Sequence, residues 1–487
     1  MIKLDDLKTT NCFIYPFSSI SEVLKNYLES VGVKVIGFID SYKTDDKLTT
    51  PETLIDYNFD YVIIFSPNHY KEIFEQLQKY IEKNKIILVH LDSSLSVPYT
   101  FVTDINDYIQ DHTKQKTETK QYFIQKSKQY ILEEEILLIG INFIDLNIKY
   151  LYFYLQKYSK YKIHIATNNQ RDIKLFKSLG INVIEYPSIE FVNLVFRCKI
   201  KIVDQNPLDK LILNSLKIGK SIQLWHGITI ESLGILTDYK ALTYDIVLST
   251  SQFVTDYSFS KIYTYKKIIH CGYPRNDVIR HSDIKLFNIE NKLLSQMKKK
   301  HSKYIIYMPT HRKMSFKSNP INYIELDRFA KKHNIVVIIK MHPFATEMFR
   351  DDLSLYQPMK EYKNLVIYPP HKDIYPLFRY SDLMIADYSS AYFDYLFADK
   401  PIVFFPYDFD EWVKSENGII LDYDKYTPGD MCYNFNELKN TILKNLQQDD
   451  YKKERKIVFD EMFSNQTKKS TSLLIDEINK LMDSCDE

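Results

Sequence analysis

The chain has 487 residues, which is too long for a single hydrophobic core, so we expect two or three domains. Hydrophobic residues make up 45% of the chain and charged residues 26%, fractions that are ordinary for a soluble globular protein. The formal net charge is +1, which gives no reason to expect nucleic acid as a partner.

The five cysteines are scattered, without a CxxC pair or any metal-ligand spacing. This pattern predicts neither a structural zinc site nor a disulfide framework, and a reducing cytoplasm fits it best. Residues 1–30 lack the basic start and apolar run of a signal peptide, and no apolar run is long enough to span a membrane. We therefore expect a cytoplasmic protein, for which any contact with the inner face of the cell membrane is peripheral.

The first 110 residues alternate between strand and helix patterns and predict a small Rossmann-like accessory domain. The expected strands are Cys12–Tyr15, Val33–Ile39, Tyr61–Ser66 and Ile86–Leu91, with helices at Ser18–Ser30 and Tyr70–Glu82. Asp40 ends a strand, like the ribose-binding acid of dinucleotide folds, but the first turn has no GxGxxG glycines. A structural or partner-docking domain is therefore favoured over a cofactor site. The polar, charge-rich residues 111–134 read as a linker.

Residues 135–235 form a second α/β run, with strands at Ile136–Gly140, Ile163–Thr167, Val183–Tyr186, Cys198–Val203 and Ile222–Trp225. The last of these strands leads into His226 and Gly227, the position at which open parallel sheets bind their ligands. A neutral imidazole there can act as a general base. A lone His is more often a packing or hydrogen-bonding residue, and the Trp-His-Gly turn favours the catalytic interpretation.

Residues 236–487 carry further polar side chains at strand ends. A strand at Ile269 leads to Arg275 and Asp277, Tyr304–Met308 leads to Arg312, and Val336–Lys340 leads to His342. Arg suits an anion site because its planar fork holds phosphate oxygens at two points. The sequence has neither a P-loop nor a carboxylate cluster with metal spacing, so we expect an anion site without metal.

A strand at Leu383–Ala386, a turn at 387–390, a helix at Ala391–Ala398 and a strand at Pro401–Phe405 follow. Unpaired N–H groups at the helix start and the hydroxyls of Ser389 and Ser390 predict a phosphate cradle. The alternative is that the serines only cap the helix. Leu474, Ile478 and Leu481 recur at helical spacing and predict a terminal helix within Ser464–Glu487.

These motifs occur in a fixed order between about Ile222 and Gly429. They are Gln223-Leu-Trp-His-Gly, Gly272-Tyr-Pro-Arg-Asn-Asp, Tyr307-Met-Pro-Thr-His-Arg, Lys340-Met-His-Pro, Ala386-Asp-Tyr-Ser-Ser, Phe393-Asp-Tyr, Lys400-Pro-Ile, Tyr407-Asp and Pro428-Gly. The series resembles the CDP-glycerol glycerophosphotransferase family of teichoic acid primases and polymerases and related bacterial capsule enzymes.

The resemblance implies a GT-B fold, in which two Rossmann-like domains face a cleft, in addition to the N-terminal Rossmann-like domain. We expect an accessory domain at 1–110, a linker at 111–134, an acceptor domain at 135–235 and a donor domain with the terminal helix at 236–487.

The activity implied is transfer of a polyol phosphate, most simply glycerol phosphate, from CDP-glycerol or CDP-ribitol to an acceptor hydroxyl, with release of CMP. The acceptor would be a surface glycan or a lipid-linked polymer, and no cofactor is required because the CDP-polyol is a substrate. His226 would be the catalytic base and His342 a second catalytic residue. Donor phosphates would be held by Arg312, Ser389, Ser390, His342 and Lys340, with support from Gly227, Arg275, Asp277, Asp387 and Asp394.

Two departures from the family pattern bear on specificity. The family often has Thr-Pro after Trp-His-Gly, then Leu and a Lys, where this chain has Ile228-Thr229-Ile230-Glu231. Glu231 would repel a phosphate-bearing acceptor, so a sugar hydroxyl on a capsule or surface glycan is a hypothesis for the acceptor. His311 stands where the family often has Trp, which leaves the details of the donor pocket open.

Two rival functions remain open at this point. A GT-B glycosyltransferase would use a nucleotide sugar and release a nucleoside diphosphate, and fold alone does not separate the two chemistries. A non-catalytic docking protein, with residues 1–110 as its interaction module, would keep its role after His226→Ala and His342→Ala.

Overall fold

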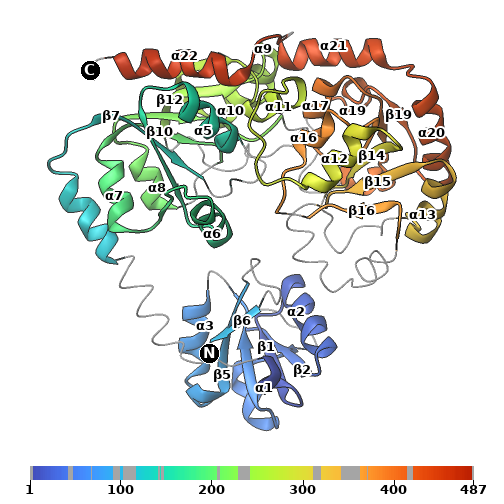
Figure 1. The fold of residues 1–487 in the computed structure, drawn as a ribbon. Coiled ribbons are helices and arrows are strands. Elements are labelled where there is room, and N and C mark those ends of the chain that lie inside the picture. Colours follow the sequence, from blue (N-terminus) through green and yellow to red (C-terminus); the bar gives the residue numbers. More distant parts are fainter. Residues whose placement is uncertain are drawn as a thin grey trace. The chain divides into compact units, whose positions relative to one another are not determined.

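The computed structural model describes residues 4–41, 48–66, 69–91, 99–102, 117–140, 143, 147–205, 209–228, 242–310, 320–341, 362–369, 371–413, 421–464 and 466–484. The chain divides into two compact units. The first comprises Met1–Glu118 with Phe344–Lys360, and the second comprises Thr119–Pro343 with Glu361–Glu487. Figure 1 shows the elements of both units.

The first unit is a six-stranded sheet of order β3-β2-β1-β4-β5-β6, parallel except for β6, which runs antiparallel to β5. Apolar residues of one strand alternate between two cores, so that Ile14 and Ile63 face one side and Phe13 and Val62 the other. The Rossmann-like prediction is confirmed. The elements are α1 (Leu4–Leu7), β1 (Asn11–Tyr15), α2 (Ser19–Ser30), β2 (Lys34–Ile39), β3 (Leu48–Thr49), η1 (Pro51–Asp56), β4 (Tyr61–Ile64), α3 (Tyr70–Leu77), η2 (Lys83–Lys85), β5 (Ile86–Leu91) and β6 (Tyr99–Val102).

The second unit contains two parallel sheets. The first has seven strands in the order β13-β12-β11-β10-β7-β8-β9. Its elements are β7 (Glu133–Ile139), α5 (Asn147–Tyr158), β8 (Lys162–Thr167), α6 (Gln170–Ser178), β9 (Ile184–Glu185), α7 (Ile189–Val195), β10 (Cys198–Val203), α8 (Lys210–Ser215), β11 (Lys220–Gln223), β12 (Thr243–Ser249), α9 (Gln252–Val254), η4 (Thr255–Phe259), α10 (Ser260–Ile262) and β13 (Thr264–His270). Because β12 and β13 pair in this sheet, it continues past residue 235, where we expected the domain to end.

The other sheet of this unit has six strands in the order β16-β15-β14-β17-β18-β19, again all parallel. Its elements are η5 (Pro274–Asn276), α11 (Asp277–Arg280), α12 (Asn291–Lys299), β14 (Lys303–Met308), α13 (Tyr323–Lys332), β15 (Ile335–Ile339), β16 (Leu365–Ile367), α16 (Tyr375–Phe378), β17 (Leu383–Ala386), α17 (Ala391–Tyr395), η7 (Leu396–Ala398), β18 (Ile402–Phe404), α18 (Phe409–Val413), α19 (Tyr423–Tyr426), β19 (Asp430–Met431), α20 (Phe435–Gln447), α21 (Lys452–Phe463) and α22 (Ser470–Asp483).

The predicted terminal helix is α22, and it contacts α5, a helix of the seven-stranded sheet, and the turn η5 (Figure 1). The Lys199 ammonium on β10 donates to the carbonyls of Met482, at 2.8 Å, and Ser484, at 2.9 Å. These carbonyls lie at the negative end of the helix dipole, where a cation is stabilising. Both sheets therefore share one C-terminal segment.

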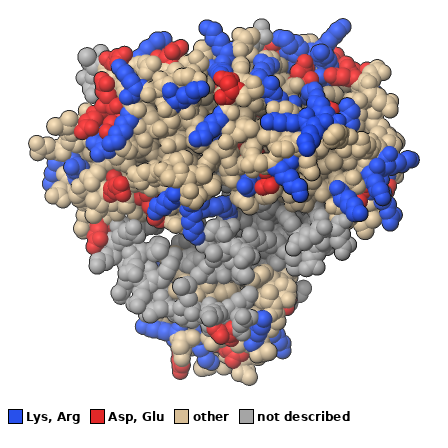
Figure 2. Space-filling view, in the orientation of Figure 1, with Lys and Arg blue, Asp and Glu red and all other residues tan. Residues whose placement is uncertain are grey.

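The expected linker is partly helical, with a helix over 117–126. Phe123 packs on Phe196 with ring centroids 4.9 Å apart, and the Tyr122 hydroxyl donates to Asn193. The end of the linker is therefore part of the second unit. On the face drawn in Figure 2, basic and acidic side chains are interspersed over that unit. Among the helices that the structure describes, none is long and apolar enough to cross a bilayer.

Candidate active site

The turn after β11 presents His226 at the carboxyl edge of the seven-stranded sheet. Trp225 has φ +55°, in the left-handed region, which costs a non-glycine residue about 1–2 kcal/mol. Its backbone N–H donates to Oε1 of the buried Gln223 at 2.9 Å, and its ring lies 4.0 Å from the imidazole of His226, centroid to centroid. A strained residue directly before a candidate base is the kind of position at which functional sites hold strain.

A contact with a backbone carbonyl indicates which ring nitrogen of His226 carries the proton. Nδ1 lies 3.3 Å from the backbone carbonyl oxygen of Asp204, at the end of β10. A carbonyl oxygen can only accept, so Nδ1 carries the proton in the neutral ring and Nε2 carries the lone pair. This tautomer allows Nε2 to take a proton from an alcohol.

Gly227 brings the His226 turn into contact with the six-stranded sheet. A Cβ atom placed on Gly227 would lie 3.0 Å from Nη2 of Arg275 and 3.4 Å from Oγ of Ser390, and its φ is +154°. Only glycine fits a backbone at this φ with neighbours this close. The structure thus places Ser390 of the expected cradle next to Gly227, which directly follows His226, the expected base, and the two segments come from different sheets.

Arg275 and Asp394 form a buried ion pair behind this contact. Nη2 of Arg275 lies 2.6 Å from Oδ2 of Asp394, and the Tyr375 hydroxyl donates to the same oxygen at 3.0 Å. The guanidinium also lies over the Tyr375 ring, 4.8 Å from its centroid. Burial raises the pKa of Asp394, and the neighbouring Arg275 opposes this shift. Asp394, expected to be a supporting residue, joins α17 to the segment after β13.

Asp387 organises the turn before α17. Its Oδ1 accepts from the Thr310 hydroxyl at 2.6 Å and from the backbone N–H groups of Tyr388, at 2.6 Å, and Ser389, at 3.3 Å. The Thr310 N–H also donates to this carboxylate. One buried side chain therefore fixes the turn and ties it to the end of β14. This geometry fits the supporting role expected of Asp387.

The two serines differ in their contacts. Ser389 Oγ accepts a long hydrogen bond of 3.4 Å from the Ala391 N–H, whereas Ser390, at the N-cap position of α17, makes no side-chain cap bond. α17 spans five residues and continues as the 3₁₀ turn η7 (Leu396–Ala398) over the rest of the expected helix. So short a helix has a small dipole, and the predicted cradle depends mainly on the serine hydroxyls and the first N–H groups.

Lys340 is buried, and its ammonium donates to the backbone carbonyls of Pro369, at 3.3 Å, and Lys372, at 2.9 Å. These contacts hold the segment after β16, and phosphate binding by Lys340 stays a prediction. Arg312 and His342, expected to hold the donor phosphates, and Glu231 and His311 lie outside the described residues.

Asp277 anchors α22. Its carboxylate accepts from the N–H groups of Ser470, at 2.7 Å, and Thr471, at 2.9 Å, and from the Thr471 hydroxyl. Burial outweighs these hydrogen bonds and raises the pKa of Asp277 to about 6. Its supporting role is therefore to hold the C-terminal helix at the segment after β13.

The sheet end opposite His226 gathers Glu135, His164 and Cys198, whose potential ligand atoms lie within 4.8 Å of one another. The Glu135 carboxylate already accepts from Arg197 Nε at 2.7 Å and contacts His164 Nε2 at 2.8 Å. Burial raises the pKa of the Cys198 thiol to about 12, so it is a poor ligand. A guanidinium in contact with the carboxylate disfavours a cation, and no metal is assigned there.

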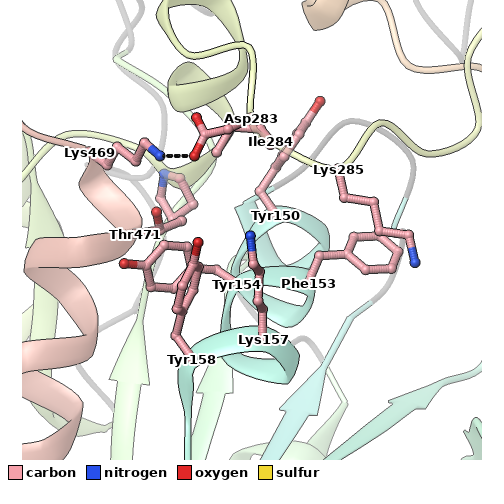
Figure 3. A pocket seen from close by; sticks show the side chains of 11 residues that line it. Tyr150, Phe153, Tyr154, Lys157, Tyr158, Asp283, Ile284, Lys285, Lys469 and Thr471 are labelled. Atoms are coloured by element: carbon pink, nitrogen blue, oxygen red, sulfur yellow. Dashed lines mark hydrogen bonds and ion pairs between the residues drawn. The ribbon is translucent and has the colours of Figure 1, made fainter.

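A separate cavity of about 130 Å³ lies along α5 (Figure 3). The rings of Tyr154 and Tyr158 line it and pack at a tilt, with centroids 4.6 Å apart, and Lys469 forms an ion pair with Asp283 at 2.5 Å. The residues that line it include none of the site residues expected from the sequence.

Sequence reasoning missed several residues that build the site. Asn147, the first residue of α5, donates through its amide to the Trp225 carbonyl at 2.6 Å and accepts from the Arg275 N–H at 3.2 Å. Lys149 and Tyr150 both contact the carboxylate of Asp373, which joins the two sheets. Its place at the start of the helix that follows β7 was the one signal in the sequence for this role.

Comparisons with known proteins agree on a family. The model of the CDP-Glycerol:Poly(glycerophosphate) glycerophosphotransferase family matches residues 120–480, and a model described as C2185-like, N-terminal, matches residues 8–87. The teichoic acid poly(glycerol phosphate) polymerase of Bacillus subtilis (strain 168) is 25% identical over 68% of this chain and 46% of its own length. The ribitol-phosphate polymerase TarK of Staphylococcus aureus (strain NCTC 8325 / PS 47) is 24% identical over 44% of this chain and 40% of its own length.

The chain thus spans about half the length of the curated relatives that it matches. Among solved structures, one of the wall teichoic acid polymerase TagF aligns with a TM-score of 0.61 at 22% identity, covering 78% of this chain and 96% of that one. This likeness shows a shared fold. With the family model matching most of the sequence, the chain belongs to the CDP-glycerol:poly(glycerophosphate) glycerophosphotransferase family.

Proposed function

We propose that the protein transfers a polyol phosphate, glycerol phosphate foremost, from a CDP-activated donor to an acceptor hydroxyl on a cell-envelope polymer and releases CMP. The observation that carries this proposal is the contact of the His226–Gly227 turn with Ser390. It places a serine hydroxyl of the other sheet against Gly227, the residue that follows the candidate base. Family membership and the names of the relatives, which include glycerol-phosphate and ribitol-phosphate polymerases, support the same chemistry.

In the proposed reaction, Nε2 of His226 takes the proton of the acceptor hydroxyl as its oxygen attacks the phosphorus that bears the polyol. The phosphorus–oxygen bond to CMP breaks, and CMP leaves with the electron pair of that bond. Phosphoryl transfer depends mainly on positioning and charge stabilisation. Ser389 and Ser390, with Arg312 and His342, would hold the donor phosphates. No metal or further cofactor is required in this scheme.

We further propose that the two sheets of the second unit form the two halves of a GT-B arrangement, with the donor held by the six-stranded sheet. The ion pair of Arg275 with Asp394 supports this, because it holds the segment after β13 to the helix that follows the cradle. A nucleotide-activated donor is a cytosolic metabolite, so transfer would occur at the cytoplasmic face, with peripheral contact to the membrane.

The acceptor hydroxyl could belong to a sugar or to a terminal glycerol phosphate. Glu231 would repel a phosphate-terminated acceptor, which supports a sugar hydroxyl as the acceptor group. Turnover should be measured on matched acceptors that end in a sugar or in glycerol phosphate. Equal or faster turnover on the glycerol-phosphate acceptor would remove the sugar proposal.

The proposed function is tested by incubating the purified chain with CDP-glycerol or CDP-ribitol and an acceptor, and by measuring the nucleotide released. Acceptor-dependent CMP supports phosphotransfer. Release of a nucleoside diphosphate from a nucleotide sugar would instead establish a glycosyltransferase. A chain that turns over neither kind of donor, and whose biological role survives His226→Ala, would be a docking protein.

A further inference from the structure

We propose that Asn147 is a positioning residue that sets the orientation of His226 relative to Ser390. The inference rests on the proposed function, which gives that orientation its importance. Asn147 is fully buried at the start of α5. Its side-chain amide joins the two segments that meet at Gly227, the turn after β11 and the segment after β13.

The two bonds of Asn147 use both functions of its amide. Nδ2 donates to the carbonyl oxygen of Trp225 at 2.6 Å, and Oδ1 accepts from the backbone N–H of Arg275 at 3.2 Å. Both partners are backbone groups in a buried region, where an unpaired polar group is unfavourable. The side chain of Asn147 therefore provides hydrogen bonds to both the Trp225 carbonyl and the Arg275 N–H.

The Trp225 carbonyl belongs to the peptide that leads directly into His226. Trp225 is held at φ +55°, a conformation that a bulky residue rarely adopts without support. The hydrogen bond from Asn147 fixes the orientation of this peptide, and with it the direction in which the imidazole leaves the strand. The Arg275 N–H belongs to the residue whose guanidinium borders Gly227 and pairs with Asp394.

Asn147 can set this geometry because the helix that carries it is anchored at both sheets. The N–H of Ile148 donates to Oδ2 of Asp204 at 2.9 Å, and the carbonyl of Asp204 contacts Nδ1 of His226. The next two residues of the helix, Lys149 and Tyr150, contact Asp373, which lies between β16 of the six-stranded sheet and α16. The start of α5, which carries Asn147, is thus fixed both to Asp204, which contacts the imidazole, and to Asp373.

The kinetic test compares Asn147→Ala and Asn147→Asp with a matched control, Asn445→Ala. Asn445 is similarly buried in α20, and its amide donates to the Thr441 carbonyl and to Asp430. Asn445→Ala therefore removes two comparable hydrogen bonds in a region that is remote from the site. Asn147→Asp is nearly isosteric and keeps an acceptor for Arg275, but as a carboxylate it cannot donate to Trp225.

Both Asn147 variants should lower kcat for CMP release by about 10- to 100-fold, the effect of misplacing a catalytic group, with a small change in KM for CDP-glycerol. Asn445→Ala should lose a similar amount of thermal stability and keep kcat within about twofold, as expected of a site remote from the chemistry. Wild-type-like kcat in Asn147→Asp would overturn the proposal. A decrease in kcat of the same size in Asn147→Ala and in Asn445→Ala would also overturn it.

A second readout does not depend on turnover. The chain has two tryptophans, so in a Trp412→Phe background the emission reports Trp225 alone. A protonated imidazole in ring contact quenches indole emission, and lowering the pH should therefore quench Trp225 through His226. Adding Asn147→Ala should shift the emission and reduce the amplitude of this quenching.

An unchanged emission and quenching amplitude in the Asn147→Ala background would contradict the proposal. The kinetic and fluorescence measurements also distinguish a failure of the proposed function from a failure of the role proposed for Asn147. If the wild type releases no CMP from any CDP-polyol, the proposed function fails, while the fluorescence result still decides whether Asn147 positions the His226 turn.

Discussion

The guanidinium of Arg275 donates to the carboxylate of Asp394 across 2.6 Å, and both side chains are almost completely buried. Arg275 follows the last strand of one sheet, and Asp394 lies on α17 in the other. The pair therefore couples the position of the cradle to that of the His226 turn, and it gives the first prediction.

Arg275→Ala should destabilise the protein by about 3–5 kcal/mol, because it leaves a buried carboxylate without its cation. The free energy of unfolding in urea measures this loss. Asp394→Ala combined with Arg275→Ala should cost less than the sum of the two single changes, since the double variant leaves no unpaired charge. Additive costs would show that the two side chains do not act as a pair.

Gly227→Ala should abolish most activity, because the added Cβ would meet Arg275 Nη2 at 3.0 Å and Ser390 Oγ at 3.4 Å. We expect a loss in kcat of about 100-fold from displacement of the turn. Gly180→Ala is the control, since Gly180 also has a positive φ, +70°, but a Cβ there has no neighbour within 4 Å. Equal activity in the two variants would contradict the packing described for Gly227.

Asp387→Ala should raise KM for the CDP-donor, because it removes the hydrogen bonds that order the turn before α17. The carboxylate holds Thr310, the last described residue before Arg312 along the chain, and it also holds the turn with Ser389. We expect a rise in KM of about 10-fold, since hydrogen bonds to a charged group contribute about 1.5–3 kcal/mol. An unchanged KM would exclude Asp387 from positioning the donor site.

Asp277 gives a prediction about pH. Burial raises its pKa in the folded protein from 3.8 to about 6, so the native state holds this proton more tightly than the unfolded state. The stabilisation is fully present below about pH 4 and is lost as the pH rises through about 6. The free energy of unfolding of the wild type minus that of Asp277→Asn should therefore decrease as the pH rises from about 4 to about 6.

Urea unfolding at several pH values between 4 and 7 checks this difference. Asp209→Asn, which alters the exposed cap of α8, serves as the control. A difference between the wild type and Asp277→Asn that stays constant with pH would contradict the account of Asp277.

The alternation of strands and helices could be predicted because buried parallel strands are short, continuous apolar runs. Leu383–Ala386 and Tyr304–Met308 are such runs, and polar residues follow each of them at the carboxyl edge. The position of His226 at a strand end could be predicted for the same reason. Which sheet β12 and β13 would join could not be predicted, because pairing depends on tertiary contacts that local sequence does not specify.

Buried polar pairs were the other feature beyond sequence reasoning. Lys149 and Asp373 are 224 positions apart and are both almost fully buried, whereas charged residues in a sequence are expected at the surface. Asn147 resembles an ordinary helix-start residue until its two backbone partners are known. The positioning network of the site therefore required the structure, while its candidate base did not.

The most direct test of the central claim is acceptor-dependent CMP release from CDP-glycerol by the wild type, His226→Ala and His270→Ala. His270 ends β13, which lies two strands away from β11 in the same sheet, and contacts Thr255, so it is a control histidine outside the site. We predict CMP release by the wild type and His270→Ala, and its loss in His226→Ala. Undiminished release by a folded His226→Ala variant would contradict the assignment of His226 as the base.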